Sequence, residues 1–244
     1  MRVPRIYTNQ PLTENLNIEL EAAPSRHLAR SLRMKPGDNL IVFNGAGGQY
    51  SAAVESIQRS AVHVTIGRFD SIERESSLSV TLGIAISRGD RMDWIVQKAT
   101  ELGVSAIAPL MSERSEVRLK DDRLTKKLHH WQKISASACE QCGRNRLPNI
   151  QPPVAIEQWI GAADASVKLV LHHLATATSA VDEAPSSIAL LVGPEGGLSD
   201  DEIDRAHQAD FRAMSLGPRI MRTETAPIAA LAILQSHWGD MNIT

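Results

Sequence analysis

Residues 190–202 read LLVGPEGGLSDDE, and this stretch decides the fold. The apolar run that ends at Val192 is typical of a buried strand, and a turn with three glycines, a proline and a glutamate follows it. Ser199 and Glu202 have the spacing of a capping box, so a helix is predicted to begin near residue 200. Because open α/β sheets bind ligands at the carboxyl ends of their strands, the turn is a candidate ligand site.

The sequence of this turn, GPEGG, differs from the known phosphate-binding turns. It matches neither GxxxxGK followed by Ser or Thr, as in a P-loop, nor the GxGxxG of a dinucleotide site. Its glutamate and the acidic residues 200–202 would repel an anion at the start of the helix. The glycines let backbone groups approach a ligand, so the turn fits a neutral or cationic ligand, or an adenosine bound by backbone groups. The alternative is a tight turn without a ligand.

Residues 215–231, SLGPRIMRTETAPIAAL, repeat this arrangement of strand end, Gly-Pro turn and helix. The turn is longer here and carries two arginines, two threonines and a glutamate within residues 219–225. Since both loops follow strands, we expect them to form two walls of one site.

The chain around these loops alternates between strand-like and helix-like patterns. The apolar runs that predict buried strands are LSVTLGIAIS, AIAPLM, VKLVLHH and SIALLVG. The helical patterns are DRMDWIVQKATELGV, DDRLTKKLHHWQKISASACEQCG, DDEIDRAHQAD and APIAALAILQSHW. Strands that alternate with helices indicate an α/β domain with a mostly parallel sheet.

Residues 1–70 have a different character and are rich in strand-like segments. Four segments predict strands, namely NLNIELEA, DNLIVFNG, QYSAAVESI and AVHVTIGRF. SRHLARSLRM predicts a short helix with grouped basic residues, and the polar residues 71–77 predict a linker. We therefore expect a small barrel or sandwich domain at residues 1–72 and an α/β domain at residues 73–244.

Length and composition indicate a soluble globular protein. The chain has 244 residues, is 43% hydrophobic and carries a net charge of −2. It contains no apolar run of the ~18 residues that a membrane helix needs. The N-terminal MRVPRIYTNQ lacks the apolar stretch of a signal peptide, so we expect no membrane association and a cytoplasmic location.

The charge is unevenly distributed along the chain. Residues 113–146 carry nine Lys or Arg against five Asp or Glu, whereas residues 147–214 carry three against ten. This asymmetry is compatible with a nucleic acid that binds one face of the protein. Two solvated helix surfaces of opposite sign are the alternative.

The two cysteines, Cys139 and Cys142, form a single CEQC motif. A zinc site needs further ligands at matching spacing, and the sequence has no second CxxC or HxxxH. A thioredoxin-type pair lies between a strand and a helix start, whereas this pair lies near the end of a predicted helix. We therefore expect structural thiols and no metal, with a redox or metal role left open.

Four motifs together resemble one protein family: DWIVQKATELGV, CEQCGRNRLP, VGPEGGLSDDE and LGPRIMRTETAPIAAL. They resemble the RsmE family of SPOUT-class ribosomal RNA small subunit methyltransferases, which methylate N3 of a uridine in 16S rRNA. The resemblance runs from about residue 80 to the end, while residues 1–70 fit the family's PUA-like β-barrel in general pattern. It implies a SPOUT α/β domain with a trefoil knot. It also implies a homodimer with the active site at the subunit interface, and 16S rRNA or the small ribosomal subunit as substrate.

The resemblance further implies S-adenosyl-L-methionine (SAM) as cofactor. Backbone after one strand and the two glycine loops would enclose it. The implied cofactor-binding residues are Leu171, His172, Val192, Gly193, Pro194, Glu195, Gly196, Gly197, Leu216, Gly217, Ile220, Met221, Thr225 and Ala226.

The chemistry suggests catalytic candidates within the second loop. Uracil N3–H is a weakly acidic imide, so the enzyme must favour the deprotonated base and align N3 with the sulfonium methyl group. Arg222, with Arg219 as a second candidate, fits stabilisation of negative charge on the base, and Glu224 fits a general base. An Arg222–Glu224 salt bridge that only holds the loop is the alternative. His172 and His173 are further candidates, because histidine is the side chain that can exchange a proton near neutral pH, although a histidine at the end of a buried strand is more often a hydrogen-bonded structural residue.

An RNA substrate also requires phosphate contacts, and arginines are the candidates as a group. They are Arg2, Arg5, Arg26, Arg30, Arg33, Arg88, Arg114, Arg118, Arg144 and Arg146.

Two other functions remain open at this point. One is a catalytically idle RNA-binding protein or ribosome assembly factor with the same fold, and the other is a SPOUT enzyme that methylates another RNA atom, such as a ribose 2′-oxygen. The intact glycine loops and the RTETAP segment favour the enzyme. The sequence determines neither the exact nucleotide nor the general base, and it leaves open whether free rRNA or the assembled subunit is the substrate.

Overall fold

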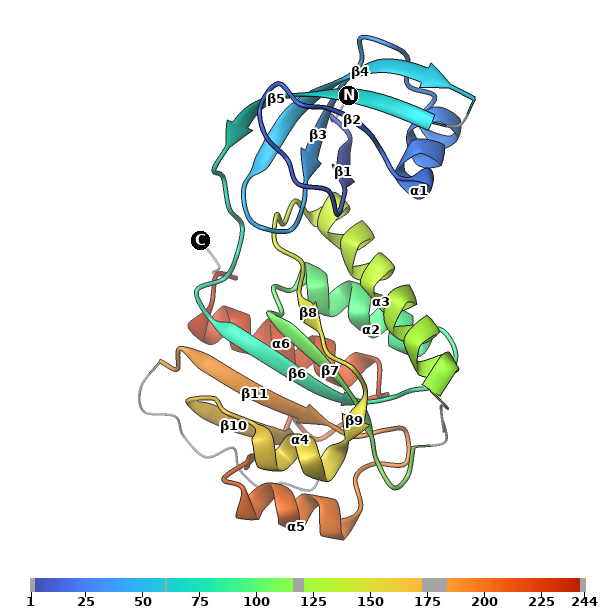
Figure 1. Cartoon of the computed structure of the whole chain (residues 1–244). Coiled ribbons are helices and arrows are strands. Elements are labelled where there is room, and N and C mark those ends of the chain that lie inside the picture. The colour runs from blue at the N-terminus through green and yellow to red at the C-terminus, as the bar shows by residue number, and fades with distance from the viewer. Residues whose placement is uncertain (1–2, 60, 116–120, 173–183, 242–244) are drawn as a thin grey trace. The chain divides into compact units, whose positions relative to one another are not determined.

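The structure is a computed structural model that describes residues 3–59, 61–115, 121–172 and 184–241. Three of the sequence candidates, Arg2, Arg118 and His173, lie outside the described residues. The chain forms two compact units, Met1–Glu75 with Ala136–Leu147, and Ser76–Ser135 with Pro148–Thr244 (Figure 1). The two predicted domains, residues 1–72 and 73–244, stay a prediction. The two compact units have other bounds, since Ala136–Leu147 belongs to the first unit.

The first unit is built on a five-stranded sheet with the order β1-β3-β4-β5-β2. β1 pairs with β3 in parallel, and the other neighbours are antiparallel. Alternate residues of the strands, such as Val42, Val54 and Val64, point into one apolar core. The four predicted strands are confirmed, and β1 is an additional strand. The bounds are β1 (Arg5–Tyr7), β2 (Asn17–Glu19), β3 (Asn39–Phe43), β4 (Gln49–Gln58) and β5 (Ala61–Asp70).

A short helical segment connects β2 to β3 in this unit. It consists of α1 (Ala22–Arg26) followed by a π-helical turn, η1 (His27–Ser31). Leu28 is fully buried in the core, whereas Arg26 and Arg30 are exposed. The predicted grouping of basic residues on a short helix is thus confirmed.

The C-terminal part of α3 (Asp121–Cys142), from Ala136 onwards, and the residues after it belong to this first unit. The Arg144 guanidinium binds the Glu75 carboxylate at 2.5 and 3.0 Å, and only 4% of its side chain is exposed. Asn145 donates to the Ile72 carbonyl at 2.6 Å and accepts from Arg5 at 2.7 Å. Part of the predicted linker at residues 71–77 is therefore held by hydrogen bonds and ion pairs.

The second unit contains a parallel sheet with the order β12-β10-β11-β6-β7-β8, and β9 also pairs with β7. The α/β prediction and the four strand segments predicted for this unit are confirmed. β8 and β9 are short additions that the sequence pattern did not indicate. The bounds are β6 (Ser79–Ala85), β7 (Ala106–Met111), β8 (Asn149–Ile150), β9 (Val154–Ala155), β10 (Val167–Leu171), β11 (Ser187–Val192) and β12 (Arg212–Met214).

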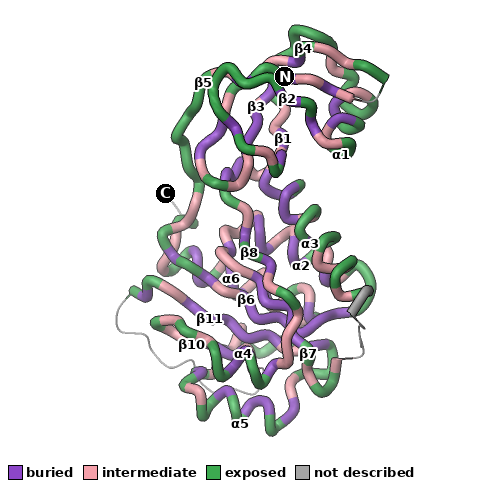
Figure 2. Tube along the Cα trace, in the orientation of Figure 1, coloured by how far each residue is buried: buried purple, intermediate pink, exposed green. Residues whose placement is uncertain are grey.

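Helices cover both faces of this sheet (Figure 1). Leu190 and Val192 of β11 pack on one side with α2 (Arg91–Glu101), α3 and α6 (Thr225–Trp238). Ala189 and Leu191 pack on the other side with α4 (Ile156–Ala162) and α5 (Asp200–Gln208). Burial on both faces explains why these strands have continuous apolar runs in place of an alternating pattern, as Figure 2 shows along β6, β7 and β11. None of the helices in the described part of the chain is long and apolar enough to cross a membrane.

Candidate functional site

Three parallel strands, β10, β11 and β12, end beside one another in the second unit. The His172 amide after β10 donates to the Met214 carbonyl at the end of β12, at 3.0 Å. The loop at residues 193–199 follows β11, and the loop at residues 215–224 follows β12. We call these two segments the first and second cavity loops, because both line one cavity.

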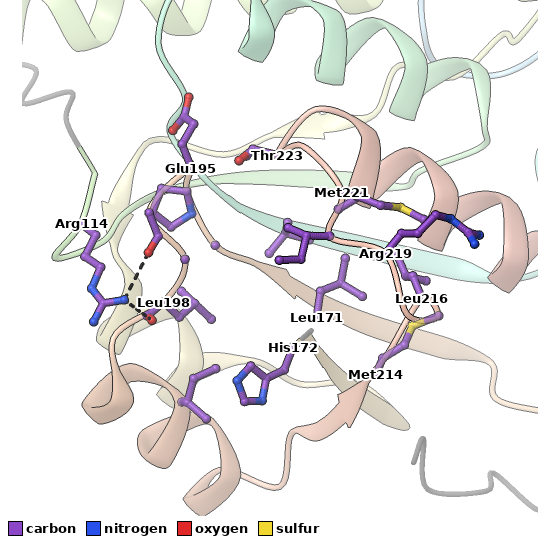
Figure 3. Close-up of a pocket in the computed structure, with 18 of the residues that line it drawn as sticks. Arg114, Leu171, His172, Glu195, Leu198, Met214, Leu216, Arg219, Met221 and Thr223 are labelled. Carbon is purple, nitrogen blue, oxygen red and sulfur yellow. Dashed lines mark hydrogen bonds between the residues drawn. The ribbon is translucent and has the colours of Figure 1, made fainter. Parts of the chain in front are cut away.

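The cavity has a volume of about 450 Å³, within the usual range for small-molecule sites (Figure 3). Its lining includes all the cofactor-binding candidates from the sequence except Thr225. It also includes residues that were not predicted to bind the cofactor: Arg114, Leu198, Asp200, Ile203, Met214, Arg219 and Thr223. Leu171, Met214 and Leu216 give it an apolar side, as the labelled side chains in Figure 3 show.

Different structural constraints explain why the cavity loops have glycine at particular positions. A Cβ atom on Gly193 would lie 2.9 Å from the Leu198 amide nitrogen and side chain, so the tight turn itself excludes a side chain. Gly197 and Gly217 have φ angles of +72° and +92°, a region that favours glycine. A Cβ on Gly196 would only touch the Arg114 side chain at 3.4 Å, an ordinary contact. The protein alone therefore leaves room for a side chain at Gly196.

The start of α5 fixes the end of the first cavity loop. Ser199 accepts a hydrogen bond from the Glu202 amide at 3.3 Å, and the Glu202 carboxylate accepts one from the Ser199 amide at 2.8 Å. This confirms the predicted capping box. Glu202 is buried, with 2% of the residue exposed, and its carboxylate also accepts a hydrogen bond from the Glu113 amide at 2.9 Å. The capping box thus ties the loop after β7 to the first cavity loop.

Arg114 reinforces this connection. Its guanidinium donates to the carbonyls of Gly196 and Leu198 at 3.2 and 3.1 Å, shown as dashed lines in Figure 3. The sequence predicted Arg114 as an RNA contact, and the structure places it at the cavity. Local sequence carries no signal for this position, because Arg114 is 82 residues from Gly196 along the chain.

Glu195, the carboxylate in the glycine turn, points away from the apolar side of the cavity (Figure 3). Its carboxylate accepts a hydrogen bond from the Arg91 guanidinium at 2.6 Å. Partial burial acts to raise the pKa of this carboxyl, but hydrogen bonds from its own backbone amide, from Arg91 and from the Arg88 amide outweigh burial and lower it. Glu195 is therefore ionised at neutral pH and holds its turn to the segment that begins α2.

The candidates in the second cavity loop occupy different positions. Arg219 lines the cavity, whereas Arg222 and Glu224 do not. The Arg222 carbonyl accepts hydrogen bonds from the first two amides of α6 at 2.9 and 3.0 Å. Arg222 itself is exposed. Among the described residues Arg222 has no ion-pair partner, so the alternative of an Arg222–Glu224 salt bridge is not observed. Glu224 instead lies 3.8 Å from Arg91.

The remaining arginine candidates are distributed over both units. In the first unit Arg26, Arg30 and Arg33 are exposed, whereas Arg5 is half-buried and bound to Asn145. In the same unit the burial of Arg144 against Glu75 leaves its guanidinium no surface for an RNA phosphate. Arg146 is exposed and lies 3.6 Å from Glu73, and Arg88 is exposed in the second unit.

The two cysteines are reduced and lie in the last turns of α3. A hydrogen bond with the Cys142 thiol, together with burial, raises the pKa of the Cys139 thiol, which favours an unreactive protonated sulfur. Within the described ranges, no cluster of three or more His, Cys, Asp or Glu could hold a metal ion.

Comparison with known protein families gives two matches. The model described as "RNA methyltransferase domain" matches residues 74–235, and the model described as "RNA methyltransferase PUA domain" matches residues 21–67. The first match alone covers more than half of the chain and includes both cavity loops.

Comparison with individual proteins gives full-length relatives. Ribosomal RNA small subunit methyltransferase E of Buchnera aphidicola subsp. Schizaphis graminum is 38% identical, with 99% of each chain covered. The Bacillus subtilis protein of the same name is 30% identical, with 93% of each chain covered. Solved structures include this methyltransferase from Neisseria gonorrhoeae bound to SAM, at 37% identity and a TM-score of 0.91, over 99% of this chain and 100% of that one. A Legionella pneumophila protein in complex with SAM is 40% identical with a TM-score of 0.95, over 99% of this chain and 100% of that one.

Proposed function

The chain belongs to the ribosomal RNA small subunit methyltransferase E family, and from this premise we propose that it methylates N3 of a uridine in 16S rRNA. It is an S-adenosyl-L-methionine-dependent rRNA methyltransferase with the α/β fold of SPOUT enzymes and a PUA-like N-terminal unit. The observation that carries the proposal is the meeting of two strand-end loops around a single cavity.

We propose that SAM lies in this cavity between the two cavity loops. The apolar side formed by Leu171, Met214 and Leu216 fits an adenine ring, and the glycines leave backbone groups accessible for hydrogen bonds. The acidic residues at the start of α5 fit a cationic ligand and disfavour a phosphate. When bound, SAM supplies an electrophilic methyl group on its sulfonium.

The residues of the second cavity loop are proposed to act on the uracil. The base must lose its N3 proton, and the negative charge then spreads to its O2 and O4 atoms. Arg222 is exposed beside the cavity and Arg219 lines it, so both guanidinium groups can stabilise that charge. We retain Arg222 as the catalytic residue. We give Glu224 a positioning role, because its carboxylate faces Arg91.

We propose that exposed arginines of the first unit bind rRNA phosphates. Arg26, Arg30 and Arg33 lie within eight residues of one another and are exposed, which concentrates positive charge on one short segment. Replacing all three with Ser should weaken rRNA binding and reduce its salt dependence. Unchanged binding and salt dependence would contradict this assignment.

We propose that the protein acts as a homodimer in the cytoplasm. Ile220 at the cavity is 82% exposed, and Ile233 on α6 is 50% exposed. Ile220 is a large apolar side chain exposed at the rim of the proposed cofactor site, and we propose that a second copy of the chain covers it. An rRNA substrate supports the location. Sedimentation equilibrium tests the dimer, and a monomer at all concentrations that give activity would contradict it.

The experiment that tests the function uses 16S rRNA and small subunits that lack the modification. Each RNA is incubated with the protein and methyl-labelled SAM and is then digested to nucleosides. The nucleosides are separated by chromatography and identified by mass spectrometry. We expect labelled 3-methyluridine, strongly reduced by Arg222→Ala and retained by Arg205→Ala, an exposed arginine on α5. A 2′-O-methyl nucleoside would contradict the proposed atom. RNA binding without any transfer would indicate an idle RNA-binding protein.

A further inference from the structure

One arginine outside the cavity lining lies between the two cavity loops. Arg91 is the first residue of α2, and its guanidinium nitrogen Nη1 lies 2.6 Å from a Glu195 carboxylate oxygen in the first cavity loop. Its Nε lies 3.8 Å from a Glu224 carboxylate oxygen in the second cavity loop. Two different nitrogens of one planar group thus face two loops that are separate in sequence.

We propose that Arg91 is a positioning residue that sets the separation of the two cavity loops and thereby the geometry of the methyl donor. The proposal rests on the proposed function, because it assigns a role at that same cavity. A guanidinium is planar and rigid, so contacts to two of its nitrogens fix both the distance and the orientation of the carboxylates. A lysine ammonium is a single point charge and fixes neither as well.

Two other side chains that hold the first cavity loop bind elsewhere than to the second cavity loop. Arg114 donates to two carbonyls, both in the first cavity loop. The Glu202 carboxylate joins the first cavity loop to the segment after β7. Arg91, in contrast, has ion pairs with a glutamate of each cavity loop.

The position of Arg91 also explains the glutamate in the glycine turn. Glu195 precedes two glycines, and an acidic helix start follows them, so its carboxylate lies in a region of negative charge. An arginine from a neighbouring strand-end segment compensates that charge. The backbone of the same segment contributes as well, because the Arg88 amide donates to Glu195.

Partial exposure indicates that this contact shapes the site more than it stabilises the fold. The side chains of Arg91, Glu195 and Glu224 are 41%, 29% and 22% exposed. Ion pairs with this exposure contribute little to global stability. Methyl transfer is far more sensitive, because a displacement of about 1 Å at a reacting centre can lower a rate by ~100-fold.

The test compares Arg91→Ala and Arg91→Lys with a matched control on the same helix. Lys98→Ala removes the ion pair between Lys98 and Glu101, whose charged atoms are 2.9 Å apart. This ion pair has a similar exposure but contacts neither cavity loop. SAM affinity is measured by isothermal titration, and kcat, KM for SAM and Tm are measured on full-length protein.

We expect Arg91→Ala to weaken SAM binding by about fivefold, in the range of one exposed ion pair. We expect kcat to fall by about tenfold or more at nearly unchanged Tm. Arg91→Lys should recover part of kcat, and Lys98→Ala should match the wild type. Wild-type kcat and SAM affinity in Arg91→Ala would overturn the proposal.

A second measurement separates loop positioning from a local effect at one glutamate. Glu224→Gln keeps the shape of the side chain but removes the charge that faces Arg91. If Arg91 acts through both loops, Glu224→Gln lowers kcat, and the double variant with Arg91→Ala falls by less than the product of the two single effects. Independent effects would contradict the proposal, and so would a folded Glu224→Gln protein with wild-type kcat. A wild-type protein that binds no SAM would instead refute the proposed function.

Discussion

Gly217→Ala tests the second cavity loop with a single methyl group. Gly217 has a φ angle of +92°, and a Cβ built on it meets no atom within 4 Å. The substitution therefore introduces backbone strain without a steric clash. A left-handed conformation costs a residue with a side chain about 1–2 kcal/mol. Because the loop is exposed and lies outside regular structure, the variant can relieve this strain by changing φ.

The relaxed loop must be driven back before it can bind SAM in the geometry seen here. The strain energy would then reduce the free energy of SAM binding, and 1–2 kcal/mol corresponds to about a 5- to 30-fold loss of affinity. Isothermal titration with SAM measures this loss, and a thermal melt should show a nearly unchanged Tm.

Gly37→Ala provides the matched control. Gly37 has a φ angle of +93° and also has no atom within 4 Å of a built Cβ, but it lies in a turn of the first unit. The same strain there should leave SAM affinity within about twofold of the wild type, because the turn is not part of the cavity. SAM affinity in Gly217→Ala equal to that in Gly37→Ala would refute the reasoning that links this loop to the cofactor.

Three further predictions concern the contacts that hold the site and the first unit. Ser199→Ala removes the cap of α5 and should lower stability by about 1 kcal/mol, seen as a Tm shift of ~2–4 °C; an unchanged Tm would contradict the role of the cap. Arg144→Met leaves the Glu75 carboxylate half-buried without its cation and should cost about 3 kcal/mol in urea unfolding. The double variant Arg144→Met/Glu75→Gln should recover part of this loss, and equal losses would contradict the pairing. The pKa of Glu195 is lowered in the folded state, so its ionised carboxylate stabilises the fold at pH values above the ordinary pKa of 4.5. This stabilisation should disappear as the pH falls through the folded-state pKa. Urea unfolding between pH 7 and pH 3 should show a weaker pH dependence for Glu195→Gln, and identical curves would contradict the shift.

The sequence predicted the elements whose signals are local. Ser199 and Glu202 are three residues apart, and the capping geometry that their spacing predicts is present. β6, β7, β10 and β11 have continuous apolar runs because both faces of the sheet are covered. In contrast, β1, β8 and β9 have only two or three residues, so no periodicity can mark them. They are strands because a neighbouring strand supplies their hydrogen bonds.

The site was predicted as far as its two loops, and the missing parts come from distant positions. Arg91 is 104 residues from Glu195 along the chain, so no local pattern connects them. The sequence interpretation took the carboxylate of Glu195 as a sign of a neutral or cationic ligand, whereas the structure pairs it with Arg91. Arg144 is another case, since its sequence neighbours suggest an RNA contact, while the structure places Glu75, 69 residues away along the chain, beside its guanidinium.

A crystal structure of the protein grown with SAM would show directly whether the two cavity loops enclose the cofactor. We expect electron density for the adenosyl and methionyl groups between residues 192–198 and 216–226, with the sulfonium methyl group open towards Arg222. Arg91 should remain in contact with both glutamates. Density for SAM elsewhere on the chain, or cavity loops that close on each other and leave no room for it, would contradict the proposed cofactor site.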